Sequence, residues 1–244
     1  RARPLALTRQ TLGARTIRYG LSPVLEGARA AQPDWPAMRG AIAAHLRDTA
    51  PRAADLGLVL AIENHQDFRS GELVDLCDAC GPGLGITFDT GNAFAVAEAP
   101  LDFLDTVLPH LTHLHLKDYR AQPTPQGWRL VRCALGDGAV PFAAIAARVR
   151  AARPGVTCVS EPGALDARHI RWLTPGWWRH YPPLPAERLA AAIAAAQVGA
   201  LPPGADARTP WERGDDAALA DWEQAMIARS DAQMRAAGFG KGGG

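Results

Sequence analysis

Three apolar runs of this chain end in a side chain that can bind a cation, and this feature limits the possible folds most strongly. The run "LVLAIENHQDF" (58–68) passes from five apolar residues directly into Glu63. Two further runs lead into Asp89 and His115, so the three candidate ligands stand 26 residues apart along the chain. A spacing of 26 residues fits one strand followed by one helix.

Strands and helices alternate between these positions. Apolar runs predict strands over 14–20, 58–63, 84–89, 112–118 and 155–161. Helical spacing of apolar residues predicts helices over 34–57, 70–80, 100–111 and 140–152. Such alternation is typical of a parallel sheet covered by helices. No Gly-rich phosphate loop follows a strand, and polar groups end strand after strand, which favours a barrel over a doubly wound sheet.

The predicted fold class is therefore α/β, a (β/α)8 TIM barrel that lacks its first strands. Only five strands can be counted, whereas a closed barrel of this type has eight. Residues 3–14 read as a helix that leads into a strand. We expect residues 1–165 to form a partial TIM-barrel catalytic domain, with a long loop over 119–138.

The remainder, residues 166–244, is expected to be a helical C-terminal extension packed on the barrel. Helices are predicted over 186–199 and 215–237, followed by a disordered Gly-rich tail. Trp172, Trp177, Trp178 and Tyr181 form an aromatic cluster in this segment, for which packing is favoured over a role as the wall of a sugar pocket.

Charge and hydropathy exclude several classes of function. The net charge is +1, so no overall field attracts the chain to nucleic acid or to an anionic membrane. No apolar stretch is long enough to span a bilayer, and no signal peptide is evident, which predicts a cytoplasmic protein. Cys77 and Cys80 have the spacing of a redox motif but fall on a predicted helix, so a structural role is favoured over a redox or zinc site.

Four strand ends carry candidate metal ligands: Glu63, Asp89, His115 and Glu161. Three carboxylates and one imidazole make a hard, mostly oxygen ligand set. This set suits Mn²⁺, Mg²⁺ or Co²⁺, and leaves Zn²⁺ open. Uncompensated buried carboxylates are costly, and a divalent cation would offset their charge.

The ordered runs "AIENH", "FDTGN", "HLHLKD", "LGDG" and "SEPG" resemble the sugar phosphate isomerase/epimerase group of the xylose isomerase-like TIM barrels. The resemblance covers roughly residues 12–163. It implies that Glu63, Asp89, His115 and Glu161 bind one divalent metal ion, with Mn²⁺ as the first choice. It also implies that Glu63 and Glu161 act as the acid/base pair of an isomerase or epimerase, through an ene-diolate of a sugar, sugar phosphate or polyol.

Four further residues are candidates for substrate binding, and three of them have a simpler alternative. His65 contacts the substrate, orients Glu63 or lies in a solvated loop. Lys117 binds a sugar oxygen or a phosphate or forms a salt bridge, and Arg18 binds an anionic group of the substrate or forms a structural pair. Asn92 stands where many epimerases of the group have a histidine. An amide can hydrogen-bond a substrate hydroxyl but cannot take a proton at neutral pH. His113 is read as a core residue or as a support for His115.

Three other functions stay open at this stage. A lyase, such as an inosose or dehydroshikimate dehydratase or an enzyme that cleaves C-glycosides, would use the same metal and enolate chemistry. A nuclease related to the AP endonucleases is disfavoured, because such enzymes hold three zinc ions with many more histidine ligands, whereas several of the seven histidines here lie outside strand ends and the chain is nearly neutral. The third is a truncated, non-catalytic barrel that binds a partner. Members of the resembled group are often dimers or tetramers, which leaves a homo-oligomer open.

Overall fold

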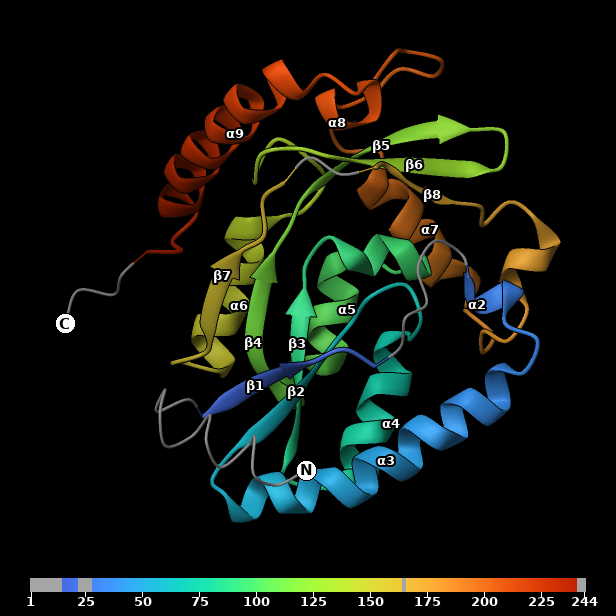
Figure 1. Ribbon diagram of the computed structural model, residues 1–244, viewed down its shortest axis with the longest axis vertical. Coiled ribbons are helices and arrows are strands. Elements are labelled where there is room, and N and C mark those ends of the chain that lie inside the picture. Colours follow the sequence, from blue (N-terminus) through green and yellow to red (C-terminus); the bar gives the residue numbers. More distant parts are fainter. Residues whose placement is uncertain (1–14, 22–27, 164–165, 241–244) are drawn as a thin grey trace.

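A curled parallel sheet lies at the centre of the molecule (Figure 1). The computed structural model describes residues 15–21, 28–163 and 166–240. The sheet has five strands in the order β1-β2-β3-β4-β7, and all neighbouring pairs are parallel. Their bounds are β1 Thr16–Tyr19, β2 Val59–Glu63, β3 Leu84–Asp89, β4 Leu111–Leu116 and β7 Thr157–Ser160. The prediction of a partial α/β barrel with five strands is confirmed.

Helices connect the strands and cover the outer face of the sheet (Figure 1). The long ones are α3 Trp35–Asp55, α4 Ser70–Cys80, α5 Pro100–Val107 and α6 Phe142–Ala152, with the short α2 Ala28–Ala31, η1 Asn92–Val96 and η2 Leu108–His110. The Asp34 side chain caps α3 by accepting the backbone N–H of Ala37 at 3.1 Å. The chain passes through Pro51 inside α3 and stays helical to Asp55.

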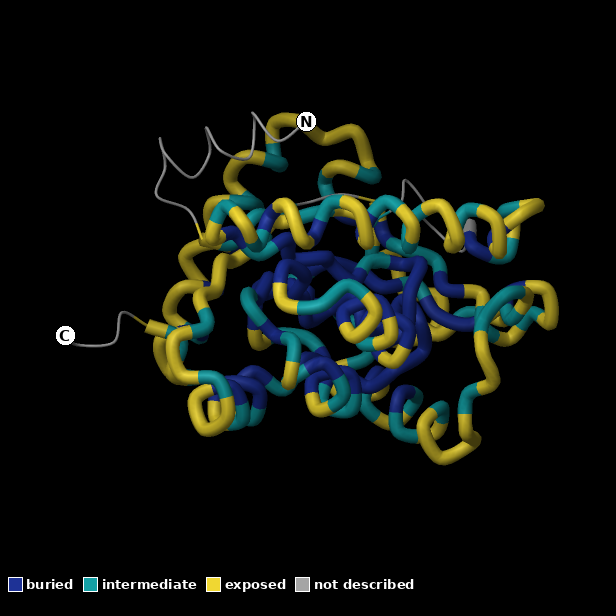
Figure 2. The backbone as a smooth tube through the Cα atoms, turned by 90° about the horizontal axis from the view of Figure 1, so that it is seen from below, coloured by how far each residue is buried: buried dark blue, intermediate teal, exposed yellow. Residues whose placement is uncertain are grey.

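The core lies between this sheet and these helices, as the central dark blue tube in Figure 2 shows. All six residues of β3 are buried, as expected for a parallel strand covered on both faces. In contrast, all four residues of β7 are exposed. A side chain at Gly83 would collide with the backbone of Ala50, so this glycine lets α3 pack closely on the start of β3.

A second, antiparallel sheet lies beyond the carboxyl ends of β3 and β4 (Figure 1). It contains β5 Tyr119–Thr124, β6 Gly127–Arg132 and β8 Arg168–Ile170, in that order. The prediction of a loop over 119–138 is therefore wrong for most of its length. Charged residues and Pro123 hide the alternating pattern of both strands, and the two-residue turn before Gly127 has no common hairpin sequence.

The rest of the described chain is mostly helical and packs against the small sheet and against helices such as α5. It contains η3 Pro175–Trp178, α7 Ala186–Ala196, α8 Pro210–Arg213 and α9 Asp216–Ala236. The helices predicted over 186–199 and 215–237 are confirmed as α7 and α9. The helix predicted over residues 3–14 and most of the predicted Gly-rich tail lie outside the described residues. Among the helices that are described, none combines the length and apolar character needed to cross a bilayer.

Candidate metal centre

The strand order places four chemically similar side chains at one edge of the sheet. Glu63 and Asp89 are the last residues of β2 and β3, His115 is the penultimate residue of β4, and Glu161 directly follows β7. Asp89 pairs with His115 in the strand register, and the Glu161 backbone N–H donates to the carbonyl of Leu116 at 3.0 Å. Since the strands are parallel neighbours, their carboxyl ends meet at the same edge.

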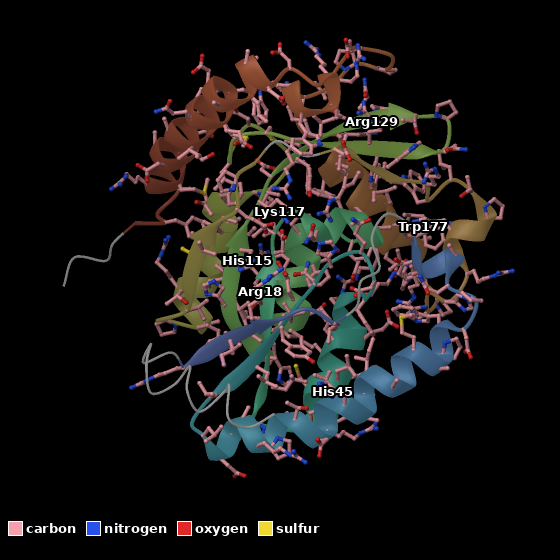
Figure 3. The ribbon with its side chains drawn as sticks, in the orientation of Figure 1. Arg18, His45, His115, Lys117, Arg129 and Trp177 are labelled. Atoms are coloured by element: carbon pink, nitrogen blue, oxygen red, sulfur yellow. The ribbon has the colours of Figure 1, made fainter. Side chains whose placement is uncertain are left out.

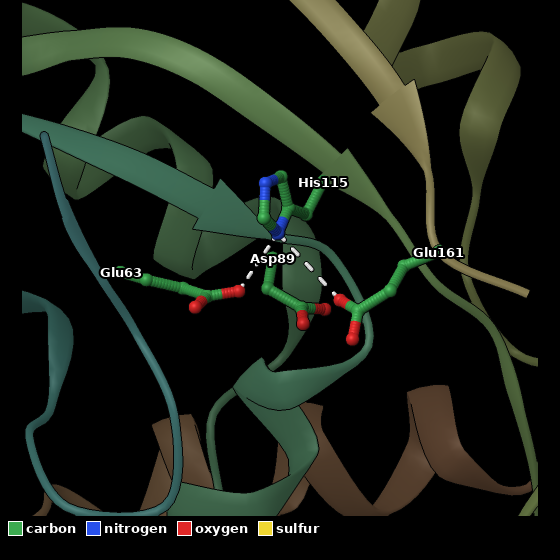
Figure 4. Close-up of side chains that lie close together, drawn as sticks. All are labelled: Glu63, Asp89, His115 and Glu161. Atoms are coloured by element: carbon green, nitrogen blue, oxygen red, sulfur yellow. Dashed lines mark hydrogen bonds and ion pairs between the residues drawn. The ribbon is translucent and has the colours of Figure 1, made fainter. Parts of the chain in front are cut away.

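The four side chains converge on one point (Figure 4). Each offers a ligand atom, and these four atoms all lie within 4.8 Å of one another. His115 Nδ1 lies 2.8 Å from Glu63 Oε1 and 3.5 Å from Glu161 Oε2. Glu63 and Glu161 approach this point from opposite sides (Figure 4). The side chain of Asp89 is fully buried, whereas 37% of the Glu161 side chain is exposed.

Cationic side chains surround the carboxylates, and Figure 3 shows Lys117, His115 and Arg18 together at the centre of the molecule. Lys117 Nζ forms a short ion pair with Asp89 and lies 2.9 Å from Glu161 Oε2. Arg18 Nε donates to Glu63 Oε2 at 2.6 Å. Both residues were predicted to bind substrate or to form salt bridges, and in this structure they form the salt bridges.

These contacts change the proton affinities of the cluster. Burial opposes the ionisation of Glu63 and Glu161. Hydrogen bonds from His115 nevertheless hold the pKa of both carboxyls below the usual value, helped by Arg18 at Glu63 and by Lys117 at Glu161. Hydrogen bonds to Glu161 and to Glu63 raise the pKa of His115 to about 9. Without a cation, the imidazole therefore carries a proton at neutral pH, and it must lose that proton to bind a metal.

The residues present fit a divalent cation. Ligands on opposite sides of a magnesium ion stand about 4.2 Å apart, so the four atoms need only small shifts to share one ion. Glu161 Oε2 is buried and lies 3.5 Å from His115 Nδ1 and 2.9 Å from Lys117 Nζ, so its charge faces the same point as the other three candidate ligands. Carboxylate oxygens are ligands that hard divalent cations prefer. Elsewhere in the described chain, no other group of three or more His, Cys, Asp or Glu side chains is close enough to share an ion.

Two asparagines hold Asp89 in place. Asn64 bonds both backbone groups of Asp89: its Nδ2 donates to the carbonyl at 3.0 Å, and its Oδ1 accepts the N–H at 2.6 Å. Asn92 Nδ2 donates to Asp89 Oδ2 at 2.6 Å. Asn92 was predicted to contact substrate, but here its amide orients the candidate ligand. The role of Asn64 was missed, although it stands directly after Glu63 in "AIENH".

Asp118 anchors the loop that follows the small hairpin. Its buried carboxylate accepts backbone N–H groups of Tyr119, Gly136, Gly138 and Val140, at 2.9 to 3.0 Å. A side chain at Gly138 would collide with this carboxylate. The motif "LGDG" is thus a backbone cradle for Asp118, a role that the sequence analysis did not assign.

Two histidines complete the surroundings. His65 is half-buried, and burial together with the charges of Arg168 and Lys117 lowers its pKa to about 4, so the ring is neutral at pH 7. His113 Nδ1 lies 2.7 Å from Thr157 Oγ1, and its ring meets that of His115 edge-on at 5.3 Å. His113 lines a cavity of about 370 Å³ on the inner face of the sheet, together with His115 and Arg18. Of the two interpretations of His113, the contact with His115 favours support.

The aromatic cluster of the C-terminal segment packs away from the metal centre, as the position of Trp177 in Figure 3 shows. Tyr181 stacks on Trp177 and lies over the guanidinium groups of Arg29 and Arg69. The Tyr181 hydroxyl donates to the carbonyl of Gln66 at 2.9 Å, which ties the segment to the loop after β2. Packing, the favoured interpretation, is what these contacts show. Cys77 is buried and Cys80 half-buried on α4, and both thiols are free.

A match to a known protein family covers most of the chain. Residues 8–175, more than half of the sequence, match the family described as xylose isomerase-like TIM barrel. The uncharacterized protein YihM of Escherichia coli K12 is 37% identical over 103 residues, which make up 42% of this chain and 31% of YihM. The matched segment therefore spans less than a third of that relative.

Solved structures share the fold. A xylose isomerase-like TIM barrel protein from Mycobacterium smegmatis, in complex with magnesium, has a TM-score of 0.55 at 20% identity, and the match covers 82% of this chain and 67% of that one. The probable 3-DHS dehydratase AsbF of Bacillus anthracis has a TM-score of 0.51 at 18% identity, covering 66% of this chain and 61% of that one. A D-psicose 3-epimerase has a TM-score of 0.51 at 21% identity, with 81% and 68% covered.

Proposed function

The chain belongs to the xylose isomerase-like TIM barrel family, and we propose that it catalyses a divalent-metal-dependent isomerisation or epimerisation of a sugar, sugar phosphate or polyol. The observation that carries this proposal is the convergence of Glu63, Asp89, His115 and Glu161 within 4.8 Å. Among the proteins that share the fold, one is a D-psicose 3-epimerase, which supports this class of reaction.

The proposed chemistry is proton transfer at a carbon next to a carbonyl. The chemistry that a bound divalent ion supplies is Lewis acidity, which stabilises negative charge on the carbonyl oxygen. Glu63 and Glu161 face each other across the centre, so one carboxylate removes the proton and the other returns it to the opposite face or to the adjacent carbon. Asn64 and Asn92 keep Asp89 oriented, and Arg18 and Lys117 keep the glutamates ionised before they act.

Mn²⁺ is the proposed cofactor, with Mg²⁺, Co²⁺ or Zn²⁺ as alternatives. Three carboxylates and one imidazole prefer a hard or borderline cation. The related structure from Mycobacterium smegmatis was solved in complex with magnesium, which supports an ion of this kind.

A lyase is the second candidate, and Asn92 favours it. Asn92 holds Asp89 and, unlike a histidine, can neither take up nor return a proton at neutral pH. With a leaving group β to the carbanion, the same enolate would expel it. The probable 3-DHS dehydratase AsbF shares the fold. Incubation with a 3-keto sugar or an inosose separates the two functions, because loss of water with new ultraviolet absorbance indicates a lyase.

The variant Glu161→Gln tests the proposal. In D₂O, the Mn²⁺-loaded wild-type protein should introduce deuterium at the carbon next to the carbonyl of at least one ketose, and the variant should lose this exchange while its circular dichroism spectrum is unchanged. Glu187→Gln, at an exposed position of α7, is the matched control and should exchange normally. Unchanged exchange in Glu161→Gln would remove Glu161 from the mechanism. Metal binding without exchange on any sugar would instead support the non-catalytic barrel.

A further inference from the structure

Four cationic side chains lie around the metal centre, and three of them already face a carboxylate. Arg18 pairs with Glu63, and Lys117 pairs with Asp89 and Glu161. The buried Arg132 of β6 lies 3.8 Å from Glu161 and donates weakly to its backbone carbonyl at 3.4 Å. These three charges offset those of the candidate metal ligands.

Arg168 differs from the other three. Among the described residues, its guanidinium forms one side-chain hydrogen bond, to the amide oxygen Asn92 Oδ1 at 3.5 Å. No carboxylate in the described part of the chain forms an ion pair with it. Asn92 in turn donates to Asp89 Oδ2 at 2.6 Å, so a single side chain separates Arg168 from a candidate metal ligand. Within the described part of the chain, the positive charge of Arg168 at the edge of the site therefore has no carboxylate as an ion-pair partner.

The position of Arg168 is fixed by the small antiparallel sheet and not by the barrel. Arg168 begins β8 and pairs with Leu130 of β6, beyond the carboxyl ends of β3 and β4 (Figure 1). The positive charge of Arg168 also helps to lower the pKa of His65, on the loop after β2. Arg168 thus lies on the side from which a substrate would approach the carboxyl ends of the strands.

With a divalent ion bound, the net charge of the site is positive. Three carboxylates stand against four cationic side chains and the two charges of a divalent ion. Such an excess attracts an anionic ligand and disfavours a cationic one. A planar guanidinium can grip two oxygens of a carboxylate or phosphate at once.

We propose that Arg168 is a specificity-determining residue that binds an anionic group, a phosphate or a carboxylate, on the substrate. This inference rests on the proposed function for the identity of the substrate as a sugar or polyol. It adds that the substrate is an acidic derivative and that the small sheet supplies the residue that recognises the acid.

Binding of unreactive polyols tests the inference. Isothermal titration calorimetry on the Mn²⁺-loaded chain would compare D-glucitol, D-glucitol 6-phosphate and D-gluconate, none of which has an aldehyde or ketone to activate a neighbouring C–H bond. We expect the wild-type protein to bind one of the two charged probes about ten- to hundredfold more tightly than D-glucitol, as hydrogen bonds to a charged group usually provide. The charged probe that binds more tightly than D-glucitol, the phosphate or the carboxylate, identifies the acidic group of the substrate.

Variants assign this preference to one side chain. Arg168→Gln should abolish it without changing the affinity for D-glucitol, and Arg168→Lys should retain part of it. Arg171→Gln is the control, since Arg171 is exposed and contacts Gln126 at the turn of the hairpin. The control should keep the full preference.

Two results would overturn the inference. One is a wild-type protein that binds neither charged probe more tightly than D-glucitol. The other is an Arg168→Gln variant that keeps the wild-type preference. Neither result depends on turnover, so the two proposals can fail separately. An anion preference without deuterium exchange on any sugar would reject the proposed reaction and support the anion site at Arg168. Deuterium exchange without an anion preference would support the reaction and reject the anion site.

Discussion

Replacing Lys117 by methionine tests how the charges of the centre are balanced. Methionine retains an unbranched stem of similar volume but removes the ammonium that lies between Asp89 and Glu161. Without a metal ion, the fully buried carboxylate of Asp89 then loses its only ion-pair partner among the described residues. The N–H of Gly91 and the amide of Asn92 still donate to it.

The magnitude follows from the burial of each partner. Breaking a buried ion pair by removing one partner costs about 3–5 kcal/mol. Asp89 keeps two hydrogen-bond donors, and the pair with the partly exposed Glu161 contributes little, so we expect about 3 kcal/mol in the metal-free protein. Removing a positive charge also favours a cation at the site. A tenfold gain in metal affinity would return about 1.4 kcal/mol when the metal is in excess.

The assay is urea unfolding of wild type and Lys117→Met, each in EDTA and in excess Mn²⁺. The stability deficit of the variant should be large in EDTA and clearly smaller with Mn²⁺. Arg235→Met removes an exposed helical ion pair with Asp231 and should change neither value. The reasoning is refuted if the variant is as stable as the wild type in EDTA, or if its deficit is the same in both conditions.

Three further predictions concern metal, loop and thiols. Excess Mn²⁺ at about 100 times its Kd should stabilise the protein by about 2.7 kcal/mol and raise its Tm by about 5–10 °C over the EDTA value, and an unaltered melting curve would argue against the site. Asp118→Asn turns a carboxylate oxygen that accepts two N–H groups into a donor, so it should lower the free energy of unfolding by about 2–4 kcal/mol. Urea unfolding measures this loss, and a loss below about 1 kcal/mol, the value of one ordinary hydrogen bond, would contradict the prediction. Burial raises the pKa of Cys77 to about 12, so at pH 8 iodoacetamide should label the exposed Cys158 of the native protein and leave Cys77 unmodified, as peptide mass spectrometry can show. Rapid labelling of Cys77 before unfolding would contradict its burial.

The ligand set could be predicted because each ligand lies at or next to the end of a strand. Apolar β-runs are local in sequence, and parallel neighbours bring their carboxyl ends together, so the positions of Glu63, Asp89 and His115 followed from the ends of these runs and their regular spacing. Glu161 followed because its strand also ends in an acidic residue. That these residues carry the chemistry remains a proposal.

The supports of the centre could not be predicted in the same way. Arg132 and Arg168 lie on strands whose alternation is masked by charged residues, and their pairing joins segments that are distant in sequence. Asn92 was assigned to substrate because its side chain can bond a hydroxyl, but the turn after β3 directs it back to Asp89. Such partners depend on tertiary geometry, which residue types and spacing do not specify.

One signal for Lys117 was present in the composition and went unused. The chain contains 26 Lys and Arg residues, and only Lys117 and Lys241 are lysines. Where nearly every other cation is arginine, a lysine at an inward-facing strand end marks a position that needs a compact ammonium and not a planar guanidinium.

The exposed strand β7 has a consequence for the kinetics of ion exchange. Glu161 follows this strand, which lies at the margin of the sheet, whereas the other three ligands are on well-covered strands. Marginal strands open locally at a lower free energy than central ones. Local opening of β7 would then limit the rate at which a bound ion is released. A bound ion would in turn slow amide hydrogen exchange in β7 more than in any other strand of the sheet.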